Sequence, residues 1–126
     1  MLNFGDMFFV EDKEYVWLYS DGKTIDAAII LNPEITKQVK ALQCSADRKG
    51  ISFKQPMYCY VELTTEDYIN HSANMLGTKN HIELNPGIRP NGKILNKEDL
   101  DNIRKEITSS PSLFKESLVN YIESIQ

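Results

Sequence analysis

The stretch 4-FGDMFFVEDKEYVWLYSDGKTIDAAIIL-31 decides the fold of this chain of 126 residues. It holds three runs rich in aromatic and β-branched residues, over residues 4–10, 14–20 and 24–31. Short polar gaps separate these runs, and the second gap contains Asp21-Gly22, a dipeptide typical of tight hairpins. The third run is apolar enough for a strand that is buried on much of both faces. We therefore expect a three-stranded antiparallel meander.

A helix is predicted to follow the meander directly. Asparagine is a good N-cap and proline suits the first helical position, so Asn32-Pro33 indicates a helix that runs to about residue 42. Helical spacing then predicts an inner face made of Ile35, Val39 and Leu42. Residues 43–50 are polar and end in glycine, which predicts a loop.

The centre of the chain predicts one more strand, over residues 57–63, because its residues MYCYVEL divide between two alternating faces. Thr64 or Thr65 would cap a helix that runs to about residue 76. Residues 81–84 are interpreted as a short strand. Residues 85–93 hold two prolines and two glycines, which predicts a loop.

Two helices are predicted at the C-terminal end. Asn96 would cap the first, with Leu95 and Leu100 as a hydrophobic staple around the cap. Ser110-Pro111 would end this helix and begin the second. Early strands followed by late helices are typical of α+β proteins. We expect a single domain, residues 1–126, in which a small curved antiparallel sheet closes into an SH3-like barrel covered by the two C-terminal helices.

Composition narrows the class of protein. Hydrophobic residues make up 41% and charged residues 25%, which is ordinary for a globular domain and excludes a disordered or collagen-like chain. The net charge of −4 argues against broad binding to nucleic acid. No apolar run is long enough to span a bilayer, and the first residues do not resemble a secretory signal. We therefore expect a cytoplasmic protein that does not enter a membrane.

The two cysteines, Cys44 and Cys59, are expected to be reduced thiols that are buried for structural reasons. His71 and His81 have no metal-ligand spacing with them, so no zinc site and no cofactor are expected. The nucleotide-binding, zinc-protease and hydrolase motifs with glycine, cysteine or histidine at fixed spacing do not occur.

Two surface features remain as candidates for binding. Five positive charges fall within a short stretch, and phosphate or single-stranded RNA could bind there, although a solvated helix face followed by a polar loop is the simpler explanation. These residues are Lys37, Lys40, Arg48, Lys49 and Lys54. Arg89 could clamp a phosphate or be an ordinary loop charge. The aromatic residues Tyr15, Trp17 and Tyr19 alternate on one face of a strand. This face is either part of the core or a surface that binds a partner.

Three short segments resemble the MazF/PemK-type toxins, which are small SH3-like barrels with helices. They are Gly5-Asp6 before an apolar run, the strand AAIIL at residues 27–31, and Gly92-Lys93-Ile94 before the helix that carries Leu100, Ile103 and Ile107. The resemblance covers much of residues 4–107. It implies a metal-independent endoribonuclease that cuts single-stranded RNA, a homodimer, and neutralisation by an antitoxin.

The resemblance also implies catalytic residues. The family's strand-ending hydroxyl corresponds to Thr64 or Thr65, although a helix cap explains these threonines as well. The family's arginine has no counterpart, and Lys23 is the nearby residue that could supply the positive charge. The alternative function is a non-enzymatic barrel that binds a protein or a nucleic acid, such as a phage or mobile-element regulator.

Overall fold

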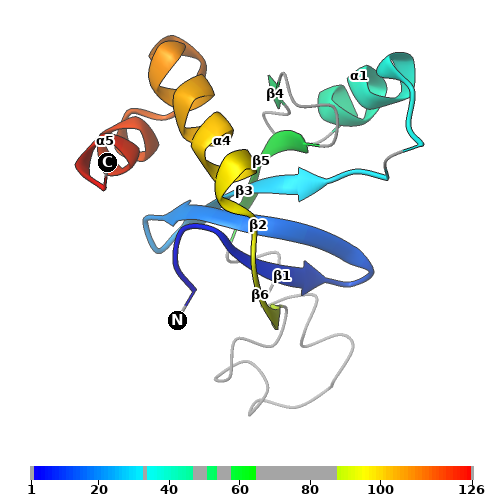
Figure 1. Ribbon diagram of the computed structural model, residues 1–126, viewed down its shortest axis with the longest axis horizontal. Helices are drawn as coiled ribbons and strands as arrows, with labels where there is room; N and C mark the ends of the chain where they lie inside the picture. Colours follow the sequence, from blue (N-terminus) through cyan, green and yellow to red (C-terminus); the bar gives the residue numbers. More distant parts are fainter. Residues whose placement is uncertain (1, 33, 47–50, 54–57, 65–87, 126) are drawn as a thin grey trace.

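The computed structural model describes residues 2–32, 34–46, 51–53, 58–64 and 88–125. They form an α+β fold, as predicted, with an antiparallel sheet and three α-helices (Figure 1). The strands are β1 (Asp6–Val10), β2 (Lys13–Ser20), β3 (Thr24–Ile30), β4 (Ile51–Ser52), β5 (Tyr58–Thr64) and β6 (Arg89–Ile94). The helices are α1 (Lys37–Ala46), α4 (Lys97–Ser109), the short 3-10 helix η1 (Pro111–Leu113) and α5 (Glu116–Ser124).

The sheet has the strand order β4-β5-β3-β2-β1-β6, and every pair of neighbours is antiparallel. The predicted meander is confirmed, because β1, β2 and β3 are consecutive neighbours. The predicted closure into a barrel is not found. In the described part of the chain the edge strands β4 and β6 do not pair, and the sheet is open.

Strand β6 forms where a loop was predicted. Its partner is β1, with Phe8 opposite Pro90 and Phe9 opposite Arg89. A proline is tolerated here because β6 lies at an edge of the sheet, where one row of backbone groups needs no partner. The predicted helix over 64–76 and strand over 81–84 lie outside the described residues, apart from Thr64, the last residue of β5.

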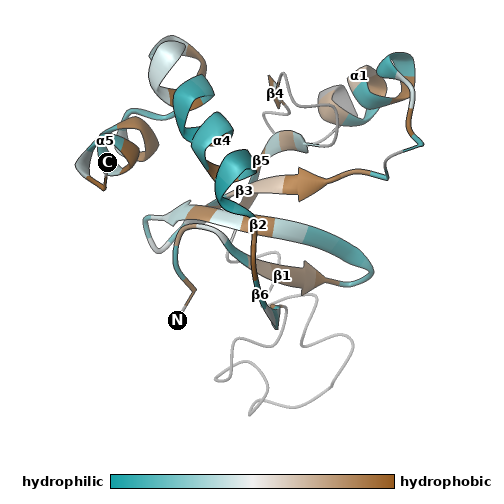
Figure 2. Cartoon of the chain, viewed as in Figure 1, coloured by the Kyte–Doolittle hydropathy of each residue, from teal (hydrophilic) through white to brown (hydrophobic). Residues whose placement is uncertain are grey.

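Hydrophobic side chains are buried on both faces of the sheet. On one face Val16, Leu18 and Tyr60 pack beneath α4 and α5, which contribute Ile103, Ile107, Leu118 and Ile122. On the other face Phe8, Tyr15, Ile29, Cys59 and Val61 form a second cluster. Strand β3 belongs to both, and its arrowhead is brown in Figure 2, as expected for the strand predicted to be buried on both faces.

The aromatic side chains of β2 do not share one face. The pairing between β2 and β3 shifts register between Trp17 and Tyr19, as it does at a β-bulge. Tyr15 and Trp17 therefore contact Phe8 in the second cluster, at ring distances of 5.5 and 5.8 Å. Tyr19 turns to the helix-covered face, where its ring lies 5.0 Å from that of Tyr121. The predicted aromatic stripe is thus divided between the two cores.

Helix α1 begins later than predicted. The side chain of Asn32 accepts a hydrogen bond from the backbone N–H of Glu34, and Thr36 Oγ1 accepts one from the N–H of Val39. The predicted inner face is wrong for Val39, which is 41% exposed, and for Leu42, which is 72% exposed, whereas Ile35, ahead of α1, packs against the second cluster. Helix α1 instead continues to Ala46, into the predicted loop.

Between Lys37 and Cys44 the buried side chains of α1 are Lys40 and Cys44, four residues apart on one helix face. Cys44 forms a disulfide with Cys59 of β5, and their Cα atoms are 5.6 Å apart. The prediction of reduced thiols is therefore wrong, while the predicted burial of both cysteines is confirmed.

The first C-terminal helix follows its predicted signals closely, whereas the second begins later than predicted, at Glu116, and Ser110 does not cap it. The Asn96 side chain accepts a hydrogen bond from the N–H of Asp99 at 2.9 Å, and Leu95 and Leu100 are buried beside this cap. After Ser110 the chain forms η1 before α5 starts. None of the described helices is long and apolar enough to cross a membrane.

Gly5 joins the N-terminal strand to the C-terminal half. Its N–H donates to Trp17 O and its carbonyl accepts from the N–H of Leu95, both at 2.9 Å. Its φ of 95° is unfavourable for other residues, and an added Cβ would lie 2.9 Å from Leu100 Cδ1. Glycine is therefore required where β1, β2 and α4 meet.

Candidate functional site

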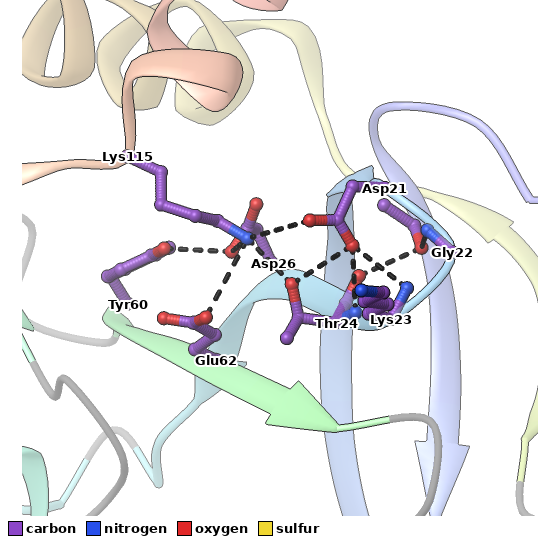
Figure 3. A network of polar contacts seen from close by, with 9 residues as sticks. Asp21, Gly22, Lys23, Thr24, Asp26, Tyr60, Glu62 and Lys115 are labelled. Carbon is purple, nitrogen blue, oxygen red and sulfur yellow. Dashed lines mark hydrogen bonds and ion pairs between the residues drawn. The ribbon is translucent and has the colours of Figure 1, made fainter.

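A cluster of polar side chains lies at the end of the sheet where β2 turns into β3 and where β5 ends (Figure 3). At its centre is the ammonium group of Lys115, which comes from the residue just before α5. Lys115 Nζ lies 2.6 Å from Thr24 Oγ1 and 3.2 Å from Asp26 Oδ1. It also lies 3.7 Å from Glu62 Oε1 and 3.9 Å from Asp21 Oδ2. One amine thus faces three carboxylates.

Asp26 is a fully buried member of this cluster, with an exposed fraction of 0%. Its Oδ1 accepts a hydrogen bond from the hydroxyl of Tyr60 at 2.8 Å, while its Oδ2 makes no hydrogen bond within the described part of the chain. Burial raises the pKa of Asp26, against the opposing effects of Tyr60 and Lys115. Burial also raises the pKa of Tyr60, so its hydroxyl stays protonated and remains a donor.

Asp21 shapes the turn at the exposed edge of the cluster. Its Oδ1 accepts hydrogen bonds from the backbone N–H groups of Lys23 and Thr24, both at 2.9 Å. These two bonds lower the pKa of Asp21, and the bond from Thr24 has the larger effect. The carboxylate of Asp21 is therefore ionised at neutral pH. The turn predicted from Asp21-Gly22 is confirmed, and it presents Lys23 at the surface beside the cluster.

The strand register brings two of the predicted catalytic residues to this end of the sheet. In the β3–β5 pair, Thr24 lies opposite Thr64 and Asp26 lies opposite Glu62. Lys23 immediately precedes Thr24, so it lies in the β2–β3 turn, at the same end of the sheet as Thr64. Thr65, the other candidate hydroxyl, lies outside the described residues.

The predicted RNA-binding residues are not gathered at this end. Lys37 is exposed on α1, which follows the opposite end of β3. Lys40 is buried, and its Nζ donates to the carbonyl of Phe53 at 2.6 Å. Burial lowers the pKa of Lys40. Arg48, Lys49 and Lys54 lie outside the described residues.

Arg89 is engaged with the protein itself. Its guanidinium donates to the carbonyl of Glu11 and lies over the ring of Phe9, 5.5 Å from the centroid. Glu11 is in the β1–β2 turn, and Lys23 is at the other end of β2. Arg89 and Lys23 are therefore separated by the length of a strand.

The sequence analysis missed Asp26, Tyr60 and Lys115. One signal was present for Asp26: a carboxylate within the apolar run TIDAAIIL must find a partner if the strand is buried. No comparable signal identifies Lys115, because it approaches Asp26 only when α5 docks on the sheet.

The described residues include no group of three or more histidine, cysteine, aspartate or glutamate side chains arranged to hold a metal ion. The fold and the cluster define a small α+β protein with an open antiparallel sheet and a lysine held among carboxylates. Comparison of the chain with family models, with curated proteins and with solved structures gives no match.

Proposed function

We propose that this protein cleaves single-stranded RNA without a metal ion, at the end of the sheet that carries Thr64 and the turn with Lys23. The single observation that carries the proposal is the β3–β5 register, which sets Thr64 opposite Thr24, the residue that follows Lys23 in the chain. A hydroxyl and an ammonium group at neighbouring strand ends can contact the same phosphate from a rigid base. The kinship with MazF/PemK-type toxins is part of this proposal, together with their dimer, their antitoxin partner, their SH3-like barrel and their cytoplasmic location.

The reaction requires no group beyond the RNA and the protein. The 2′-oxygen of a ribose attacks the adjacent phosphorus and the bond from phosphorus to the 5′-oxygen breaks. The departing 5′-oxygen takes a proton from water and becomes a 5′-hydroxyl, while a 2′,3′-cyclic phosphate remains on the other fragment. Negative charge builds up on the phosphate oxygens, where the Lys23 ammonium and the Thr64 hydroxyl would stabilise it. A lysine makes one point contact where an arginine would make two parallel hydrogen bonds, so this stabilisation is smaller.

Asp21 is the carboxylate that would accept the proton of the 2′-hydroxyl. Its side chain is 41% exposed, it is ionised at neutral pH, and its hydrogen bonds hold the turn that carries Lys23. The same hydrogen bonds lower its pKa, which makes Asp21 a weak base. We therefore expect slow cleavage.

The test is incubation of the purified protein with a long single-stranded RNA in EDTA, followed by gel analysis and identification of the ends. The proposal predicts discrete cuts that leave cyclic phosphates. Lys23→Ala should reduce the cleavage rate at least tenfold, and Thr64→Val should do the same. Lys13→Ala is the matched control, since Lys13 is exposed at the opposite end of β2. Intact RNA, or equal loss in the control, would refute the proposal.

A second candidate function is binding of a protein partner without catalysis. A cavity of about 530 Å³ lies between α4, η1 and β4, and it supports this candidate. The rings of Phe53 and Phe114 stack at 6.0 Å in its lining, and Leu113 at its rim is 57% exposed. Light scattering tests this second function, because it measures the mass of the protein purified alone and of the protein purified with any partner retained from coexpression. A strict monomer that retains no partner would count against this function.

A further inference from the structure

We propose that the Cys44–Cys59 disulfide is a redox-controlled latch that holds α1 against the sheet. The disulfide joins the last part of α1 to the middle of β5, across 15 positions of the sequence. Its two cysteines lie in the second hydrophobic cluster, with exposed fractions of 3% and 0%. The latch involves neither Lys23 nor Thr64, so it stands apart from the proposed cleavage of RNA.

The packing of α1 makes this covalent bond important. From Lys37 to Cys44 the buried side chains are Lys40 and Cys44, and the intervening and preceding residues are exposed. Lys40 reaches the carbonyl of Phe53, next to β4. Most of the helix surface, including the apolar side chains of Val39 and Leu42, faces solvent. Apolar burial, the usual source of helix stability in proteins, is therefore small for α1.

The length of α1 leads to the same conclusion. Helix α1 has 10 residues. Isolated helices shorter than about 12–15 residues are marginal in water, so α1 depends on its attachments to the rest of the protein. In Figure 1, α1 stands apart from α4 and α5, near the tip of the β3 arrow. Loss of the disulfide removes the covalent attachment of this helix to β5.

The redox step consumes one dithiol for each disulfide. A thiolate of the dithiol attacks Cys44 Sγ, the bond between the two cysteine sulfurs breaks, and Cys59 leaves as a thiolate that takes up a proton. The second thiol of the reductant then displaces Cys44, which also becomes a thiol, and the reductant becomes a cyclic disulfide. Because both sulfurs are buried, the attack follows a local opening of α1, and the latch opens slowly.

Hydrogen–deuterium exchange of the full-length protein tests the latch. The oxidised protein, the protein reduced with dithiothreitol, and the reoxidised protein are compared over peptides that cover α1 and α4. Alkylation under denaturing conditions, followed by intact mass, counts the thiols in each state. We expect no alkylated cysteine before reduction and two after it. Exchange in α1 should rise at least tenfold on reduction, return on reoxidation, and stay unchanged in α4.

A double variant, Cys44→Ser with Cys59→Ser, should exchange like the reduced protein in both redox conditions. Ala41→Ser is the matched control, because it changes an exposed position of the same helix and leaves the disulfide intact. Three results would each overturn the proposal. The first is two free thiols in the protein after treatment with oxidised dithiothreitol. The second is unchanged hydrogen–deuterium exchange of α1 on reduction. The third is an equal rise of exchange in α4, which would indicate general destabilisation.

Discussion

Replacing Lys115 by methionine tests the polar cluster most directly. Methionine keeps the apolar length of the side chain and removes the ammonium group, which lies 3.2 Å from Asp26 Oδ1 and within 4 Å of two further carboxylates. Asp26 is fully buried and would lose its nearest positive charge. We expect Lys115→Met to destabilise the fold strongly.

The magnitude follows from two limits. At 3.2 Å and an effective dielectric constant of about 20, one ion pair is worth about 5 kcal/mol. The variant can avoid part of this loss by protonating Asp26. For a carboxyl group with the ordinary pKa of 3.8, protonation at pH 7 costs about 4 kcal/mol. Since Lys115 is itself 19% exposed, we expect a loss of about 3 kcal/mol at pH 7.

The loss should depend on pH in a defined direction. Burial raises the pKa of Asp26, so the folded state binds a proton more readily than the unfolded state. The contribution of Asp26 to stability therefore falls as the pH rises above 3.8 toward its folded pKa. Removal of the ammonium group raises that pKa further. The difference in stability between wild type and variant should accordingly be large at pH 7 and shrink as the pH approaches 4.

Urea unfolding monitored by the fluorescence of Trp17 measures both the loss of stability at pH 7 and its dependence on pH. The free energy of unfolding is determined for the wild type and for Lys115→Met between pH 4 and pH 8. Lys105→Met serves as the control, because Lys105 is an exposed lysine of α4. A difference below about 1 kcal/mol at pH 7, the value of a surface ion pair, would refute this account of the cluster. A difference that does not change with pH would refute the role of Asp26.

Three further changes have defined outcomes in the same unfolding assay. Tyr60→Phe removes the hydroxyl that binds the buried carboxylate and should cost about 2 kcal/mol; no loss would mean that this bond is dispensable. Asn96→Ala removes the cap of α4 and should cost about 1 kcal/mol, with lower helicity by circular dichroism. Gly5→Ala should cost at least about 2 kcal/mol, since its Cβ would lie 2.9 Å from a methyl group of α4. Gly22 has a similar φ of 93°, but an added Cβ would meet nothing within 4 Å, so Gly22→Ala should cost only about 1 kcal/mol. Equal losses of stability in the two glycine variants would contradict the steric argument.

The parts of the fold that sequence analysis predicted correctly depend on neighbouring residues. The meander follows from three β-rich runs and the Asp21-Gly22 turn, and α4 follows from the Asn96 cap. The two faces of β5 follow from simple alternation. In each case the decisive interactions join residues that are close in the sequence or repeat with the period of the element.

The parts that failed depend on contacts between distant segments. Strand β6 exists because β1 offers it a free edge, which outweighs the unfavourable presence of Pro90. The buried face of α1 is set by the disulfide of Cys44 and by the hydrogen bond from Lys40 to the carbonyl of Phe53. The helical spacing of apolar residues predicts neither of these contacts. The bulge after Trp17 sends Tyr19 to the other core, and one extra residue in a strand leaves no clear mark in its composition.

The candidate site shows the same division. Thr64 could be chosen from the sequence because it ends a predicted strand and matches the family's hydroxyl, and Lys23 because it could replace the family's arginine; both stay predictions. The partners of Asp26 could not be chosen in this way, because Lys115 belongs to a segment far along the chain and approaches only when the C-terminal helices pack on the sheet.

The position of β1 between β2 and β6 has a consequence for biosynthesis. Strand β2 follows β1 within a few residues, whereas the pairing of Phe8 with Pro90 closes a loop of most of the chain. Contacts between such distant residues form late in folding, since the entropy of closing the loop must be overcome first. During translation the meander can form as soon as β3 leaves the ribosome, while the outer edge of β1 stays unpaired until β6, at residues 89–94, has emerged. The nascent protein therefore exposes this edge, with Phe9 beside it, throughout that interval, and chaperones that recognise extended apolar segments would meet the chain there.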